Sequence, residues 1–132
     1  MKFHHIGIFT KSINYGKKTV LSFLKVKNVS RVYNDKNLGV KVLFIKDESN
    51  IVYEIVSPLG KKNPVKKVLQ ENKNILNHVA YKVKNFDKKI NFLRNKGFAP
   101  LSKPSEALAF KGKRVCFFLT PLNFIIEIIE DD

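Results

Sequence analysis

The sequence predicts one α+β domain built from two consecutive βαβββ repeats. Short runs of β-branched and aromatic residues, typical of strands, are interrupted twice by longer segments whose apolar residues recur at helical spacing. One strand motif with a histidine and one with a glutamate each occur twice, at the same separation. The 132 residues, 44% of them hydrophobic, are enough for one compact domain. We therefore expect a single domain over 1–132, composed of repeat 1–60, a linker helix at 61–74 and repeat 75–132.

The first repeat begins with the apolar run FHHIGIF, which predicts a strand over 3–9. Segment 12–24 is typical of an amphipathic helix, because Ile13 and Val20 fall on one side and Ser12 can cap its start. Three further strands are predicted at 29–33, 39–45 and 50–56, with a hairpin turn between the last two.

The linker and the second repeat follow the same logic. Asn63-Pro64 predicts the start of the linker helix, because proline is favoured at the first helical position. Segment 75–83 is typical of a strand, and 85–97 of a helix that stops at Gly97. The last three strands are predicted at 99–102, 113–120 and 124–129.

The repeat identifies one histidine of the pair in the first strand. When HHIGI is placed over NHVAY, His5 falls on His78, and at the same offset Glu54 falls on Glu127 (78 − 5 = 127 − 54 = 73). His4 then matches an asparagine and is expected to point to the opposite face, because neighbours alternate along a strand. Small residues two positions after each repeated histidine leave room for a cavity beside the imidazoles.

The repeated glutamates lie inside apolar strands, where a lone ionised carboxylate is costly. Two histidines and two glutamates in matching registers suggest one shared cation: His5, Glu54, His78 and Glu127. Their nitrogen and oxygen donors suit Zn, Co, Ni, Mn or Fe, whereas Ca and Mg usually avoid imidazole. The structural alternative is a set of hydrogen-bonded core histidines and half-solvated glutamates.

With these residues in place, the chain resembles the vicinal oxygen chelate superfamily. The stretch from EIVSPLG to NKGF (54–98) is most similar to methylmalonyl-CoA epimerases and their glyoxalase-like relatives. The resemblance implies two βαβββ modules around a sheet-lined cleft, a divalent metal on the four residues above, and a homodimer. It also implies that the metal stabilises an enolate while Glu127 removes a proton α to a carbonyl.

Two positions depart from the epimerase pattern. Epimerisation needs a second acid or base, and the strand over 39–45 offers only Lys41. The loop before the penultimate strand lacks the usual glycine-rich form, and Glu106 within it is a second candidate. For both residues, plain solvent exposure is the competing interpretation.

The functional prediction is a metal-dependent isomerase or epimerase acting on an acyl-CoA or acyl-carrier thioester. One alternative is a glyoxalase-I-like lyase, which shares the same ligand set. Another is a resistance-type protein that binds a small molecule without turnover.

The net charge of +14 comes almost entirely from lysines spread through the chain, which does not favour nucleic-acid binding. It suits instead a phosphorylated cofactor or an acidic carrier. The single cysteine permits no intrachain disulfide, and no apolar run is long enough for a signal peptide or a membrane span. We therefore expect a cytoplasmic protein with no membrane or nucleic-acid partner.

Overall fold

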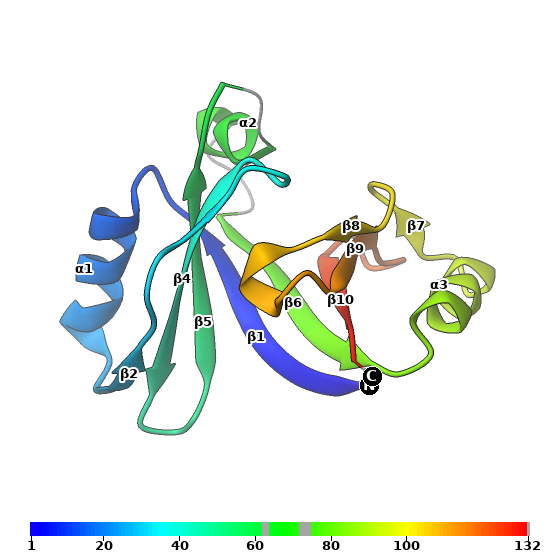
Figure 1. Cartoon of the computed structure of the whole chain (residues 1–132), viewed down its shortest axis with the longest axis horizontal. Helices are drawn as coiled ribbons and strands as arrows, with labels where there is room; N and C mark the ends of the chain where they lie inside the picture. Colours follow the sequence, from blue (N-terminus) through cyan, green and yellow to red (C-terminus); the bar gives the residue numbers. More distant parts are fainter. Residues whose placement is uncertain (62–63, 72–74, 132) are drawn as a thin grey trace.

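The computed structural model describes residues 1–61, 64–71 and 75–131. Within these residues, ten strands form one open, mixed sheet, and three α-helices pack around it (Figure 1). The α+β fold predicted from the sequence is confirmed.

The first half runs from β1 to β5. Its elements are β1 (Lys2–Phe9), α1 (Ile13–Phe23), β2 (Val26–Val29), β3 (Tyr33–Asp35), β4 (Val40–Asp47) and β5 (Val52–Pro58). Ser12 caps α1 as predicted, its Oγ accepting a hydrogen bond from the Tyr15 amide at 3.1 Å. The prediction of one strand over 29–33 is wrong, because β2 ends and β3 begins inside that range. The Ser30 amide still donates to the Phe44 carbonyl, but the Phe44 amide donates to the Ser30 hydroxyl instead of a backbone carbonyl, and the strand ends there.

The helix α2 (Pro64–Glu71) connects the halves and packs against β1 and β5. Its Val65 is fully buried. The linker helix was predicted over 61–74 with its start at Asn63-Pro64. Asn63 and positions 72–74 lie outside the described residues. None of the helices in the described part of the chain combines the length and apolar character needed to cross a bilayer.

The second half runs from β6 to β10. Its elements are β6 (Leu76–Val83), α3 (Phe86–Asn95), β7 (Ala99–Pro100), β8 (Ser105–Glu106), the 3-10 helix η1 (Leu108–Phe110), β9 (Arg114–Leu119) and β10 (Ile125–Glu130). Gly97 has a φ of +91°, which suits the predicted stop of α3. The strand predicted over 99–102 is shorter in the structure, because the chain bends at Leu101 and Ser102.

The two halves meet at the centre of the sheet, whose strand order is β2-β4-β5-β1-β6-β10-β9-β7. β1 and β6 pair antiparallel, while β5 is parallel to β1 and β10 is parallel to β6. The order β5-β1-β6-β10 thus places the two strands of each repeat that carry the predicted ligands next to one another.

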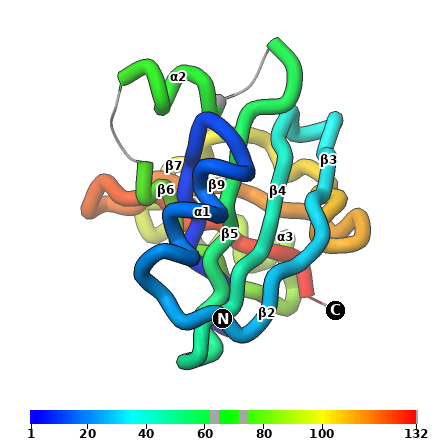
Figure 2. The backbone as a smooth tube through the Cα atoms, turned by 90° about the vertical axis from the view of Figure 1, so that its left-hand side faces the viewer, coloured from blue at the N-terminus to red at the C-terminus, as the bar shows by residue number. Residues whose placement is uncertain are grey.

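Helices α1 and α3 pack on the side of this sheet that faces away from the site, whereas Val65 of α2 packs on the site's side against Phe9 and Val56. α1 packs on β4 and β5 around Ile45 and Ile55, and α3 packs on β9 and β10 around Phe118 and Ile128. In Figure 1, α1 and α3 lie on the outer sides of the molecule and β8 lies between them; in Figure 2, α1 faces the viewer and α3 lies behind β4 and β5. A hydrogen bond links η1 to the first half, because Oδ2 of Asp35 in β3 accepts the Leu108 amide proton at 2.9 Å.

Candidate metal centre

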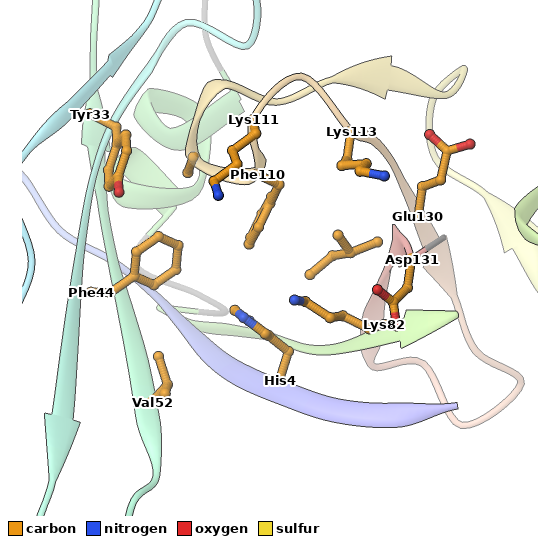
Figure 3. A pocket seen from close by; sticks show the side chains of 12 residues that line it. His4, Tyr33, Phe44, Val52, Lys82, Phe110, Lys111, Lys113, Glu130 and Asp131 are labelled. Atoms are coloured by element: carbon orange, nitrogen blue, oxygen red, sulfur yellow. The ribbon is translucent and has the colours of Figure 1, made fainter. Parts of the chain in front are cut away.

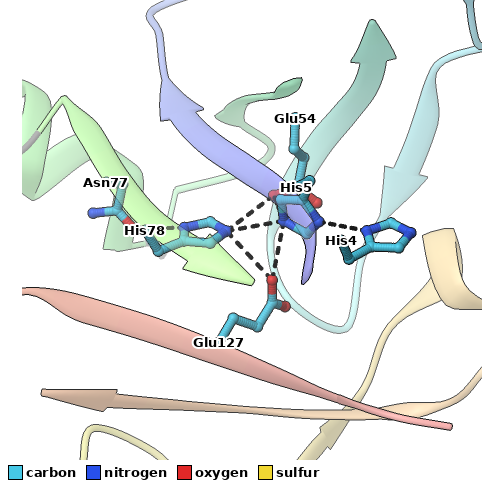
Figure 4. Close-up of polar contacts among 6 residues, drawn as sticks. All are labelled: His4, His5, Glu54, Asn77, His78 and Glu127. Atoms are coloured by element: carbon cyan, nitrogen blue, oxygen red, sulfur yellow. Dashed lines mark hydrogen bonds and ion pairs between the residues drawn. The ribbon is translucent and has the colours of Figure 1, made fainter. Parts of the chain in front are cut away.

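Four buried side chains from the four central strands converge on one point (Figure 4). They are His5 of β1, Glu54 of β5, His78 of β6 and Glu127 of β10, and we call them the ligand quartet. The two Nε2 atoms are 3.2 Å apart, and each lies 3.2–3.3 Å from Oε1 of both glutamates. One donor atom from each residue lies within 4.8 Å of all the others.

The register of the central strands explains this convergence. Gly7 stands opposite both His78 and Glu54, and Ala80 stands opposite both His5 and Glu127. A Cβ added at Gly7 would lie 2.1–2.5 Å from three atoms of the His78 ring. Glycine at this position is therefore required for the ring to reach the centre of the quartet.

His4 does not point away from the site as strand alternation predicts. Its Nδ1 lies 2.8 Å from Nδ1 of His5. The pairing of β1 with β6 shifts register between Phe3 and His5, and such a bulge interrupts the alternation of side chains. Burial, followed by the positive charges of His5 and Lys82, lowers the pKa of His4 to about 4, so this ring is neutral at pH 7.

Aromatic rings enclose the two imidazoles. Phe44 packs edge-on against His5 at a centroid distance of 5.8 Å, and Phe117 packs edge-on against His78 at 5.2 Å. Phe110 of η1 stacks on His5 with an interplanar angle of 11°. Phe44 and Phe117 were not predicted from the sequence, although the offset that relates the ligands also relates these two residues.

The electrostatics of the quartet depend on what neutralises its two carboxylates. Burial by itself lowers the pKa of His5, but the charge of Glu54 and hydrogen bonding to both glutamates raise it to about 10. Burial likewise lowers the pKa of His78, and hydrogen bonding to Glu127 and Glu54 raises it to about 9. Burial raises the pKa of both carboxyls, yet the imidazoles hold them below their ordinary range. Protons on the histidines are thus one way to balance this site.

A divalent cation is the other way, and the donor atoms fit one. Ligands about 2.1 Å from a common metal, at tetrahedral or octahedral angles, lie roughly 3.0–3.4 Å from their nearest neighbours. Nδ1 of His78 lies 2.9 Å from Oδ1 of Asn77 and donates to it, so neutral His78 presents a lone pair at Nε2. Oε1 of Glu127 is buried 3.2–3.3 Å from Nε2 of both histidines, and when these nitrogens carry no proton it has no hydrogen-bond donor among the described residues. Several lone pairs therefore face one point, which a cation would satisfy.

A cavity of about 260 Å³ opens beside the quartet, and Glu54, His78 and Glu127 form part of its wall. The rest of the wall is mainly apolar and comes from both halves, including Val40, Val42, Val56, Ala107, Phe110 and Phe117. Asp35 also lines it, but its two carboxylate oxygens accept the backbone amides of Leu38 and Leu108. The quartet therefore supplies the chemically available carboxylates of this cavity among the described residues.

The structure does not bring Lys41 or Glu106 to the quartet. Lys41 pairs with Ser57, so it shares the α1 side of β4 with Leu43, whereas Phe44 pairs with Glu54 on the opposite side. Glu106 is exposed on β8 and lines a separate outer cavity.

A second cavity of about 390 Å³ shares Ala109 and Phe110 of η1 with the first (Figure 3). His4, Tyr33 and Phe44 line it, together with Lys82 and Lys111. The ring of His4 therefore contacts both a quartet histidine and this second cavity.

Comparisons with known proteins agree with this fold. The model of the glyoxalase/bleomycin resistance protein/dioxygenase superfamily matches residues 4–117. A hypothetical protein from Bacillus halodurans C-125 is similar in structure, with a TM-score of 0.84 and 24% identity over 99% of this chain and 94% of that chain. Methylmalonyl-CoA epimerase from Mycobacterium tuberculosis gives a TM-score of 0.78 and 17% identity over 99% and 88% of the two chains.

A glyoxalase I mutant from Zea mays gives a TM-score of 0.67 and 13% identity, covering 99% of this chain and 44% of that longer chain. No curated protein sequence matches the chain. At these identities the structural matches establish the fold, and the family model extends the assignment to a superfamily.

Proposed function

The chain belongs to the glyoxalase/bleomycin resistance/dioxygenase superfamily, and we propose that it is a divalent-metal-dependent enzyme that moves a proton on a carbon next to a carbonyl. The observation that carries this proposal is the ligand quartet itself. Its donors face one point at the wall of an apolar cavity, and Oε1 of Glu127 is buried there within 3.2–3.3 Å of both imidazole Nε2 atoms.

The residues of the quartet divide the work. His5, Glu54 and His78 would hold the metal, which supplies Lewis-acid stabilisation of negative charge on a carbonyl oxygen. Glu127 would accept the α proton at a carboxylate oxygen, and the electrons of the broken C–H bond would move toward the carbonyl. The apolar wall excludes water, which strengthens these electrostatic interactions. Lys41 and Glu106 have no part in this step, since neither lines the cavity.

An acyl thioester is the substrate class that we propose first. The cavity of about 260 Å³ suits a short acyl group, and the long thiol carrier would extend outside it. In Figure 4, Glu54 and Glu127 approach the two imidazoles from opposite sides. For inversion, Glu54 would loosen from the metal and return a proton to the face of the carbon opposite Glu127.

A glyoxalase-I-like lyase is the second candidate, and the composition of the cavity wall favours it. No titratable side chain outside the quartet is available there among the described residues, because Asp35 is fully engaged by backbone amides. Moving a proton between adjacent carbons of a hemithioacetal on one face needs only one base. Glu127 alone would suffice for that reaction.

Metal content and proton exchange test the proposal together. The protein would be purified without a metal-affinity tag, analysed for bound metals, and incubated in deuterated water with methylmalonyl-CoA or with a hemithioacetal of a 2-oxoaldehyde and a thiol. We expect about one metal per chain and metal-dependent deuterium exchange or turnover with one of the two substrates. Exchange by the metal-loaded protein but not by Glu127→Gln would support Glu127 as the base.

Absence of stoichiometric metal under all loading conditions would contradict the proposal. Tight metal binding without exchange or turnover of either substrate class would favour the third possibility, a binding protein. The homodimer expected from the sequence stays a prediction. The proposed chemistry does not depend on it, because one chain supplies the whole quartet.

A further inference from the structure

Each quartet histidine is preceded by a residue that is extra in the pairing of β1 with β6. On β1, Phe3 pairs with Tyr81 and His5 pairs with Ala80, so His4 has no opposite residue. On β6, the same ladder steps from His78 to Leu76 while β1 advances by one residue, so Asn77 is the extra residue there. The two bulges are related by the internal repeat, and bulges characteristically redirect side chains near functional sites.

Both bulge residues contact the same atom of the histidine that follows. Asn77 Oδ1 lies 2.9 Å from Nδ1 of His78, and His4 Nδ1 lies 2.8 Å from Nδ1 of His5. Figure 4 shows the two contacts on opposite sides of the quartet. The ring of His4 is itself held edge-on by Phe44 and Phe110, at centroid distances of 6.2 and 5.4 Å.

We propose that His4 is a positioning residue for metal binding, which does for His5 what Asn77 does for His78. The inference rests on the metal site of the proposed function. In this arrangement Nδ1–H of His5 donates to Nδ1 of neutral His4, whose own proton is on Nε2. Nε2 of His5 is then left as a lone pair directed at the centre of the quartet.

The physical reason is the choice between two tautomers. Without an acceptor at Nδ1, neutral His5 can carry its proton on Nε2, where it would occupy the position of the cation. Hydrogen-bond partners of ligating histidines fix both the tautomer and the ring orientation, and their loss typically weakens metal binding by about 10–100-fold. An acceptor beside His5 is therefore expected to matter as much as the amide of Asn77.

The test compares His4→Phe with His4→Asn. Phenylalanine keeps an aromatic ring between Phe44 and Phe110 but accepts no hydrogen bond, whereas asparagine copies the second half. We expect Zn²⁺ affinity, measured by competition with a chelator, to fall about 10–100-fold in His4→Phe. In His4→Asn it should return to within about 5-fold of the unchanged protein. Asn77→Leu serves as the matched variant of the other half and should resemble His4→Phe.

A second measurement separates positioning from a general structural effect. The ¹⁵N chemical shifts of the His5 ring in the Zn²⁺-loaded protein should show a protonated Nδ1 in the unchanged protein and in His4→Asn. Unaltered Zn²⁺ affinity in His4→Phe, or an Nε2-protonated His5 in the unchanged protein, would overturn the inference. If His4→Phe does not fold, His4→Asn and His4→Leu give the same comparison, and failure of the unchanged protein to bind any metal would count against the proposed function itself.

Discussion

The two halves of the sheet supply the same donors from the same registers but surround them differently. In each half a histidine of the inner strand and a glutamate of the neighbouring parallel strand reach the quartet, and a phenylalanine packs edge-on against the histidine. Around this shared arrangement, the first half has Gly7 and His4 where the second has Ala80 and Asn77. The ring that stacks on His5, Phe110, comes from the second half.

The difference shows which features the site requires and which it tolerates. The donors and their aromatic walls are duplicated, which is expected if all four donors act on one charge. The residue beside each histidine varies, but it keeps an acceptor within 2.8–2.9 Å of Nδ1. The first half needs glycine at position 7 for a steric reason, because the His78 ring occupies the space that a methyl group would need.

The largest effect on activity is expected from replacing one of the two glutamates, because they are proposed to have different roles. Glu127→Gln removes the proposed base but keeps a carbonyl oxygen for the metal, so proton transfer should slow by about 10²–10⁴-fold. Metal content, measured by elemental analysis, should change little. The isosteric change Glu54→Gln is the control from the other half.

The behaviour of Glu54→Gln separates the two proposed reactions. If the protein inverts an acyl thioester with two carboxylates, this variant should exchange deuterium into one epimer while losing inversion. If it isomerises a hemithioacetal with Glu127 alone, turnover should fall by less than about 10-fold. Equal and complete losses in both variants, with metal retained, would contradict the assignment of Glu127 as the single primary base.

A smaller effect is expected from exchanging the residues that face the histidines. Gly7→Ala places a methyl group where the His78 ring lies, so the ring must rotate away from the quartet and from Asn77. Metal affinity should fall by about 10–100-fold, and the free energy of unfolding by about 1–3 kcal/mol. Both can be measured, by chelator competition and by chemical denaturation.

The reciprocal change Ala80→Gly creates no clash and is the matched control. It should cost only about 0.5–1 kcal/mol of stability, through the greater backbone freedom of glycine. Equal metal affinities in Gly7→Ala and the unchanged protein would show that the His78 ring does not need the position seen in the structure.

These differences also show what the sequence could and could not predict. Because the repeat fixes the register of both strands in each half, the quartet could be predicted as a set from four residues. Alternation failed at His4, since a bulge depends on the pairing of two strands that are distant in the sequence. The position of Phe110 was also beyond prediction, because it depends on a loop of one half folding over the other. The prediction of a strand over 29–33 was wrong for another reason: the hydroxyl of Ser30 accepts the hydrogen bond of the Phe44 amide.

The pH dependence of the metal-free protein tests whether both halves contribute to one electrostatic unit. The folded protein raises the pKa of His5 to about 10 and of His78 to about 9, from 6.5 in the unfolded chain. Between pH 6.5 and 9 the folded state therefore binds more protons than the unfolded state, and its stability falls as pH rises. The fall should amount to a few kcal/mol, at up to about 1.4 kcal/mol per pH unit for each proton.

Denaturation with urea at several pH values measures this slope. Saturating Zn²⁺ should remove it, because the metal holds both imidazoles deprotonated. His5→Gln and His78→Gln should each reduce the slope. A flat profile for the metal-free protein would show that the carboxylates are not balanced by protons on the histidines.

The smallest expected effect concerns Lys41 and its counterpart at the repeat offset, Arg114. Arg114 donates hydrogen bonds to Asp87 of α3 and to Glu130, at 2.7–3.3 Å, and therefore lies on the helix side of its strand. Lys41 lies on the corresponding side of β4, facing away from Glu54. Lys41→Met should therefore change turnover by less than about 2-fold, since long-range charge effects at a partly exposed site are screened by solvent.

Arg114→Met should lower the midpoint of thermal unfolding while leaving turnover at permissive temperature unchanged, because it removes ion pairs that lie outside the site. A large loss of turnover in Lys41→Met, with metal affinity and stability intact, would restore Lys41 as the second acid or base and would mean that β4 presents its other face to the substrate during the reaction.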